Sequence, residues 1–271
     1  MILASHGLIA SQIASFDADA VAFFGRVTTA GGSLTNTEKQ AVNQLVLDLK
    51  ANSLWTPMKA IYPMVGASAA ACAQNLKSSS FTGTFSSGWT FASTGVTGNG
   101  TSAYMNTGLV PNTNLSQNSS SGGVYINSLS AGSVNKSDVY FGASNAGFSA
   151  GFYLLPMAGS NTNDYSRNNS DAAPAALSWA DCRGFYQMYR NISASYVVRR
   201  NNVPITYSIA SVSPATFPVW IAGLNNASTL VEPSSNRIAL SYLGDGLTDT
   251  QASNFYTAVQ AFQTTLARQV V

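Results

Sequence analysis

The sequence SYVVRRNNVPITYSI, residues 195–209, predicts a β-hairpin. Two runs rich in β-branched and aromatic residues flank the pair Asn201-Asn202. Asparagine adopts a positive φ more readily than most non-glycine residues, and a tight two-residue hairpin turn needs that conformation. We therefore expect strands at 195–200 and 203–209, joined by a turn at the two asparagines.

Similar runs recur from about residue 79 to residue 246, each bounded by turn-forming residues. Ten short strands at this spacing are typical of a β-sandwich. We predict a mainly β fold in which residues 79–271 form a jelly-roll β-sandwich that ends in a helix. The other candidate strands are Gly88–Val96, Ser102–Leu109, Gly123–Leu129, Asp138–Ala143, Phe148–Leu155, Gly184–Arg190, Phe217–Leu224 and Arg237–Leu243.

Helical signals lie at the two ends of the chain. Residues 17–27 form a short candidate, and the segment after Thr35 is a stronger one because Thr35 and Glu38 have the spacing of a capping box. Its apolar residues fall on one stripe: Ala41, Val42, Leu45, Val46 and Leu49. Thr248 and Gln251 repeat the capping-box spacing before a C-terminal amphipathic helix. We therefore predict that residues 1–78 form an N-terminal helical and extended attachment region.

The apolar residues of that region have two possible partners. Phe23 and Phe24 on the first helix, and the stripe of the second helix, lie outside the predicted sandwich. They pack either on its flank or on a neighbouring subunit, because apolar surface left over from a domain needs cover. As a candidate assembly interface we select Phe23, Phe24, Val42, Leu45 and Leu49.

Low charge is the main feature of the composition. Only 9% of the residues are charged while 45% are hydrophobic, and the formal net charge is +2. Charged residues make up about 25% of ordinary soluble domains. The cations are scattered singly, which argues against nucleic-acid binding, and no apolar run is long enough for a membrane span. We expect a neutral polar surface and no cofactor.

Catalytic and metal-binding groups are sparse. A nucleophilic triad would have to use the single histidine, His6, far from the predicted domain. A glycosidase needs two carboxylates across a cleft, and Asp164, Asp171 and Asp181 lack any paired spacing within a strand. The same loop could supply oxygens to calcium, but turn formation explains these residues more simply. We predict no catalytic residue and no metal site.

The loop at 159–183 is the best candidate for recognition. It combines Tyr165 and Trp179 with Arg167 and Arg183, and aromatic faces beside such donors bind sugars or anchor protein interfaces. The alternative is that both aromatics pack within the loop or the core. Phe148, Phe152 and Tyr153 recur at strand spacing, so we assign them to the inner faces of the sandwich. Cys72 and Cys182 are expected to be buried thiols.

Four segments carry a resemblance to a known family. Their order resembles concanavalin A-like (LamG-type) jelly-roll domains, in particular those of structural proteins of tailed bacteriophages. The resemblance covers roughly residues 85–265 and implies a component of the particle surface. The segments are GNGTSAYMNTG at 98–108, VVRRNNVPI at 197–205, VWIAGLNNAS at 219–228 and RIALSYLGDGLTDTQASNFYTAVQAFQ at 237–263.

Three functions follow from the sequence and the resemblance. The first is a non-enzymatic virion structural protein, a capsid decoration or a component of a fibre or tail appendage, assembled in the host cytoplasm with copies of itself and other virion proteins. The alternative is a carbohydrate-binding adhesin module that attaches to a host-surface glycan. The third, a polysaccharide depolymerase, needs two of the acids to meet in one cleft.

Overall fold

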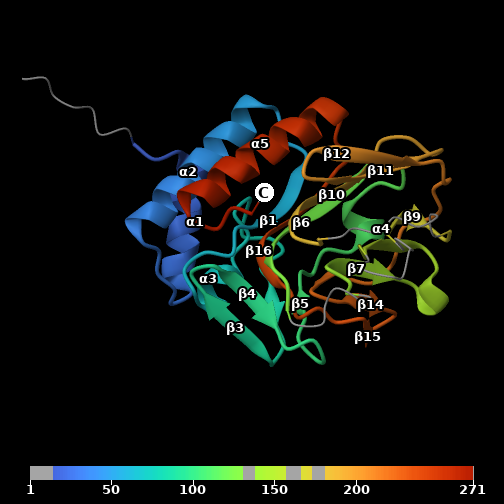
Figure 1. Cartoon of the computed structure of the whole chain (residues 1–271), viewed down its shortest axis with the longest axis horizontal. Helices are drawn as coiled ribbons and strands as arrows, with labels where there is room; N and C mark the ends of the chain where they lie inside the picture. The colour runs from blue at the N-terminus through green and yellow to red at the C-terminus, as the bar shows by residue number, and fades with distance from the viewer. Residues whose placement is uncertain (1–14, 131–137, 157–165, 173–180, 271) are drawn as a thin grey trace, which may run out of the picture.

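Two β-sheets packed face to face, with helices along one outer side, form the body of the protein (Figure 1). The computed structural model describes residues 15–130, 138–156, 166–172 and 181–270. The helices are α1 (Ala18–Thr29), α2 (Asn36–Ala51), α3 (Ala69–Cys72), α4 (Pro111–Asn114) and α5 (Asp249–Thr265), with a 3-10 turn at Ala146–Phe148. Within the described ranges, no helix is both long and apolar enough to cross a membrane.

The larger part of the fold is sheet A, whose strand order is β12-β11-β10-β6-β16-β4-β3, with β1 also paired to β16. All of its pairings are antiparallel. The strands are β1 (Met58–Tyr62), β3 (Trp89–Ala92), β4 (Gly95–Gly98), β6 (Ser120–Ser128), β10 (Gly184–Arg190), β11 (Tyr196–Arg200), β12 (Val203–Tyr207) and β16 (Arg237–Gly244).

Sheet B lies against the inner face of sheet A. Its order is β15-β14-β7-β13-β5-β2, and β8 pairs with both β7 and β9. One pairing, β14 with β7, is parallel. The strands are β2 (Thr84–Phe85), β5 (Met105–Asn106), β7 (Phe141–Ser144), β8 (Gly151–Leu154), β9 (Arg167–Ser170), β13 (Trp220–Ile221), β14 (Leu224–Asn226) and β15 (Thr229–Val231). A mainly β sandwich with N-terminal helices and a C-terminal helix is therefore confirmed.

The predicted hairpin has the geometry that its asparagines indicated. Asn201 and Asn202 have φ values of 43° and 66°, and Arg200 pairs with Val203 across the turn. The Asn201 side chain also accepts a hydrogen bond from the Phe185 amide, 2.9 Å away. This contact ties the turn to β10, the next strand of sheet A.

The predicted strand at 102–109 is wrong over most of its length. Only Met105–Asn106 pairs with neighbouring strands. The Asn99 side-chain oxygen accepts hydrogen bonds from the amides of Thr101, Ser102 and Ala103. Because these amides are satisfied by a side chain, the segment forms a turn instead of a ladder.

The N-terminal region belongs to the same body as the sandwich. Strand β1 pairs with β16, with Ile61 opposite Tyr242. The predicted capping box is present at Thr35, and the other carboxylate oxygen of Glu38 accepts a hydrogen bond of 2.7 Å from the Gly66 amide. Residues 15–78 therefore share one core with sheet A.

The predicted assembly interface is corrected by the same packing. Four of its residues are buried inside the single chain, and Phe24 is partly buried against the same cluster. They cover the outer face of sheet A together with α5 (Figure 1). The flank of the sandwich, and not a neighbouring subunit, is thus their partner. The four buried residues are Phe23, Val42, Leu45 and Leu49.

A buried guanidinium fastens the chain after α5 to the N-terminal region. Arg268 is 4% exposed, and burial lowers its pKa to about 10. It donates to the carbonyls of Pro63, Met64 and Ala239 and to the side chain of Gln263. One side chain thus joins β1, β16 and α5.

Replacing this side chain tests how much the junction contributes. We expect Arg268→Met to lower the free energy of unfolding by about 2–4 kcal/mol, because it leaves several buried carbonyls without donors. Urea denaturation followed by circular dichroism measures the change. Arg183→Met is the control, since Arg183 has 44% of its side chain exposed and should cost about 1 kcal/mol or less. Equal losses in the two variants contradict the assignment.

Candidate functional site

A cavity of about 250 Å³ opens on the outer face of sheet B. Its floor is apolar and its rim carries Phe148, Arg167 and Glu232. The floor residues come from three parts of the sequence that meet around β7: the segment before β7, strand β8 with the residue after it, and the hairpin of β14 and β15. The floor residues are Val139, Tyr153, Leu155, Leu224 and Val231. We call this floor together with the rim residues the sheet B cavity.

Gly142 on β7 lets this floor form. Its neighbours Phe141 and Ala143 point into the core between the sheets, so position 142 faces outward. A Cβ atom at Gly142 would lie 2.3 Å from Tyr153 Cβ and 2.9 Å from Leu224 Cδ1. Glycine therefore allows these two side chains to close over the strand.

Phe148 stands at the rim in an unfavourable backbone conformation. Its φ is +60°, and the residue is 41% exposed even though phenylalanine is usually buried. Gly147 and Ala150, on either side, have φ values of 70° and 52°. Left-handed backbone costs a bulky residue about 1–2 kcal/mol. Such strain is kept where neighbouring groups hold it, and it gathers at functional sites.

Two side chains of the adjacent segment hold this turn. Arg167 Nη1 donates to the Phe148 carbonyl at 2.5 Å, and Asp171 accepts from the Ala150 amide at 2.6 Å. The Arg167 guanidinium carbon lies 5.6 Å from the centre of the Tyr153 ring. Its Nε atom is buried with no hydrogen-bond partner among the described residues. Among the described residues, the hydrogen bond of the guanidinium is the one from Nη1 to the Phe148 carbonyl.

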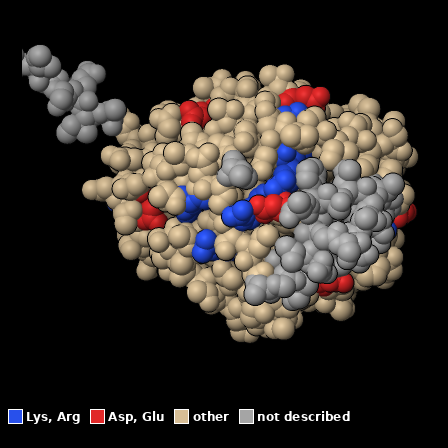
Figure 2. Space-filling view, viewed as in Figure 1, with Lys and Arg blue, Asp and Glu red and all other residues tan. Residues whose placement is uncertain are grey.

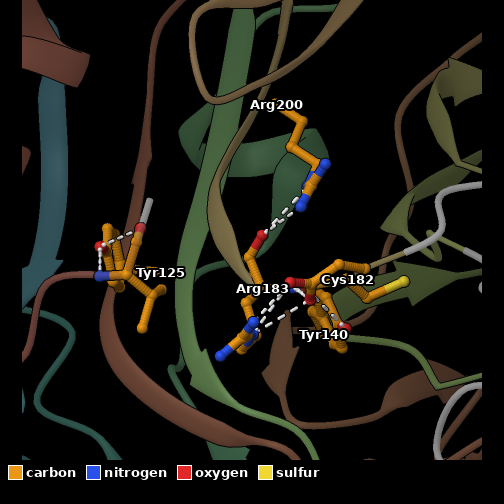
Figure 3. A network of polar contacts seen from close by, with 7 residues as sticks. Tyr125, Tyr140, Cys182, Arg183 and Arg200 are labelled. Atoms are coloured by element: carbon orange, nitrogen blue, oxygen red, sulfur yellow. Dashed lines mark hydrogen bonds and ion pairs between the residues drawn. The ribbon is translucent and has the colours of Figure 1, made fainter.

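A second cavity, of about 440 Å³, lies at the end of β6 and is lined by polar residues including Arg183. Arg183 and Asp181 form an ion pair of 2.8 Å. The hydrogen bond from Arg183 lowers the pKa of the Asp181 carboxyl, and the same contact raises the pKa of Arg183. Arg200 donates twice to the Arg183 carbonyl (Figure 3). These contacts hold Arg183 and Asp181 in place at the edge of the cavity.

The face drawn in Figure 2 is mostly uncharged, and Lys and Arg gather beside the residues that are not described. Among the described residues, no three His, Cys, Asp or Glu side chains come together as a metal site. Several acids instead stabilise the fold. Asp245 pairs with Lys59, Asp249 accepts from Tyr189, and Asp138 accepts from Asn236.

The structure describes two of the four predicted recognition residues, Arg167 and Arg183. Arg167 and Arg183 line different cavities, while Tyr165 and Trp179 lie outside the described residues. Arg167 is on strand β9, in a segment predicted as a loop.

The cavity also corrects one assignment of aromatic residues. Phe152 lies between the sheets as predicted, but Phe148 is exposed and Tyr153 faces outward. The glycine before Phe148 interrupts the alternation and is the sequence signal for this turn. No such signal marks Leu224, Val231 or Glu232, because they reach the cavity only through the pairing of distant strands.

No family model matches the chain, and no curated protein matches its sequence. Domain 4 of AbnA, a GH43 extracellular arabinanase of Geobacillus stearothermophilus solved with arabinotriose, is 14% identical with a TM-score of 0.46, over 73% of this chain and 98% of that one. The CBM40 of the Ruminococcus gnavus IT-sialidase is 15% identical with a TM-score of 0.37. The match covers 49% of this chain and 80% of that one. Trypanosoma rangeli sialidase in complex with sialic acid is 11% identical with a TM-score of 0.48. The match covers 82% of this chain and 39% of that one. Values of this size carry no argument about ligand or activity.

Both thiols are buried and free, as predicted (Figure 3 shows Cys182). The Tyr140 hydroxyl donates to the Cys182 carbonyl over 3.5 Å. Burial raises the pKa of Cys182 to about 11 and that of Cys72 to about 12. Neither thiol is therefore a nucleophile near neutral pH.

Thiol labelling checks these pKa values. We expect no reaction with Ellman's reagent at neutral pH in the folded protein and reaction of both cysteines in urea. The ordinary thiol pKa is 9.0, so the unfolded chain ionises first. Stability should then fall as the pH rises from about 9 through about 11 and 12. Rapid labelling of the folded protein contradicts this assignment.

Proposed function

We propose that this chain is a non-enzymatic carbohydrate-binding β-sandwich whose glycan site is the sheet B cavity. The observation that carries the proposal is the exposed Phe148 ring, held at the rim by a strained turn. An aromatic face beside a cavity with a few polar groups suits a sugar, which presents an apolar C–H face and hydroxyl groups.

The absence of catalysis is part of the proposal. Among the described residues that line the sheet B cavity, Glu232 is the one acid. Glycoside hydrolysis by the common mechanisms uses two carboxyl groups about 5–9.5 Å apart. One carboxylate with an arginine supports binding and orientation, but not that chemistry.

Removing the strained aromatic tests this function. We expect Phe148→Gly to weaken glycan binding at least about tenfold, since the stacking surface is lost. The same variant should be up to about 1 kcal/mol more stable, because glycine accepts a positive φ at little cost. A glycan array identifies the ligand, titration calorimetry measures affinity, and urea denaturation measures stability.

Ile192→Gly is the matched control. Ile192 is 56% exposed, its φ is not positive, and it does not line the sheet B cavity. This variant should lose stability and keep wild-type affinity. Wild-type affinity in Phe148→Gly means that the cavity is not the glycan site.

The chain is also a candidate structural component of a bacteriophage particle, present in the virion with copies of itself and other virion proteins. The sequence resemblance gives this setting, and the low charge supports it. Contacts built from neutral hydrogen bonds and apolar packing are not screened by salt. Within the particle, the glycan site would serve attachment to a host surface.

Light scattering tests the assembly. We expect an oligomer whose mass stays constant from about 0.01 to 1 M NaCl, a range over which the screening length falls about tenfold. A monomer at every salt concentration contradicts the structural role and leaves the glycan-binding proposal intact.

A further inference from the structure

We propose that an ordered internal water binds between sheet A and α5, where it joins the side chains of Gln187, Tyr242 and Arg199. This site lies on the other sheet from the sheet B cavity and does not depend on glycan binding. Four polar atoms of the three side chains are buried and have no hydrogen-bond partner among the described residues. They are Gln187 Nε2, Gln187 Oε1, Tyr242 Oη and Arg199 Nε.

Strand register places the three side chains in one row on the outer face of sheet A. Arg199 of β11 lies opposite Gln187 of β10. Gln187 in turn lies opposite Gly123 of β6, and Gly123 lies opposite Tyr242 of β16. The ring of Phe255 on α5 packs on the Tyr242 ring, with 4.6 Å between the ring centres. The row is therefore covered by the helix, and both Gln187 and Tyr242 are fully buried.

Gly123 allows the Tyr242 ring to reach across β6 towards Gln187. A Cβ atom at Gly123 would lie 2.3 Å from Tyr242 Cε1 and 3.1 Å from Cδ1, so the ring lies over the glycine. Burial raises the pKa of the Tyr242 hydroxyl, and the neighbouring Gln187 and Ser121 side chains oppose this rise. Neither of these side chains makes a hydrogen bond with the hydroxyl. Polar groups that are close but not bonded are commonly bridged by water.

The unpaired atoms include both donors and an acceptor, which suits water and does not suit an ion. Gln187 has an unpaired N–H group and an unpaired carbonyl oxygen, while Arg199 Nε can only donate. The amide oxygen would repel an anion, and the guanidinium would repel a cation. A buried water both donates and accepts, and it makes about three hydrogen bonds. Without it, each of these groups would lose its hydration on folding and gain no partner.

The position of Arg199 is fixed independently of the water. Arg199 is 5% exposed, and its Nη1 atom donates to the Asn202 side chain in the hairpin turn. The water would therefore connect this hairpin, through Arg199, to β10 and β16 beneath α5.

A high-resolution crystal structure of the full chain tests the site directly. We expect an ordered water beneath α5, within hydrogen-bond distance of Gln187 and Tyr242. A direct hydrogen bond between these two side chains with no water beside them overturns the proposal. A bound ion in the same position also overturns it.

Substitution of the two side chains tests the site in solution. If a water satisfies them, Tyr242→Phe and Gln187→Met each remove hydrogen bonds and should lower the urea midpoint of unfolding. If the atoms are unpartnered, each substitution should raise the midpoint, because it replaces a desolvated polar group with an apolar one. A rise in either variant therefore overturns the proposal.

Tyr62→Phe is the matched reference for the tyrosine variant. The Tyr62 hydroxyl belongs to a fully buried side chain and donates directly to the Phe81 carbonyl. Its removal should lower the midpoint about as much as Tyr242→Phe does. The double variant of Gln187→Met and Tyr242→Phe should lose less than the sum of the two single losses, because both side chains act through one water. Additive losses overturn the shared site.

Discussion

Burial of sheet A on both faces is the constraint on which the other features depend. Its inner face packs on sheet B, and its outer face is covered by α1, α2 and α5. On the outer side, Phe255 of α5 meets the rings of Phe185 and Tyr242 at centroid distances of 5.4 and 4.6 Å. A sheet buried on two faces needs apolar residues at successive positions, which β10 and β16 provide. Sheet B is then left with an outer face on which a cavity can form.

The low charge of the chain is compatible with this burial because polar groups are satisfied by the backbone. Arg190 is fully buried, and it donates to the carbonyls of Asn168, Ile192, Ser193, Ser195 and Ile209. Its counterpart on the opposite side of the sheet, Arg268, is bonded in the same way. Arginine suits this role because its planar group presents five N–H donors and remains charged. Such contacts join loops to strands without a carboxylate partner.

Sequence signals within a few residues predicted much of the fold. The asparagine pair marks its hairpin, and the two capping boxes mark the starts of α2 and α5, because turn and cap preferences act locally. The short strands β2 and β9 have no such signal, since each forms only by pairing with a strand outside its own segment, β5 for β2 and β8 for β9. Strand β1, before the predicted division at residue 78, likewise depends on a distant partner, because it pairs with β16 near the other end of the chain.

Local sequence signals did not predict the positions of the residues in the candidate site. Arg167 was selected for its charge and aromatic neighbours, yet its position follows from the pairing of β9 with β8, and its cavity is closed by residues 139 and 224–232. The strand spacing of Phe148, Phe152 and Tyr153 predicts that all three lie on the inner faces of the sandwich. The positive φ of Phe148 places the ring outside, where it gains little from burial and the backbone is strained. Arg167 holds Phe148 in this strained position, and contact with a glycan is the role that we propose for the exposed side chain.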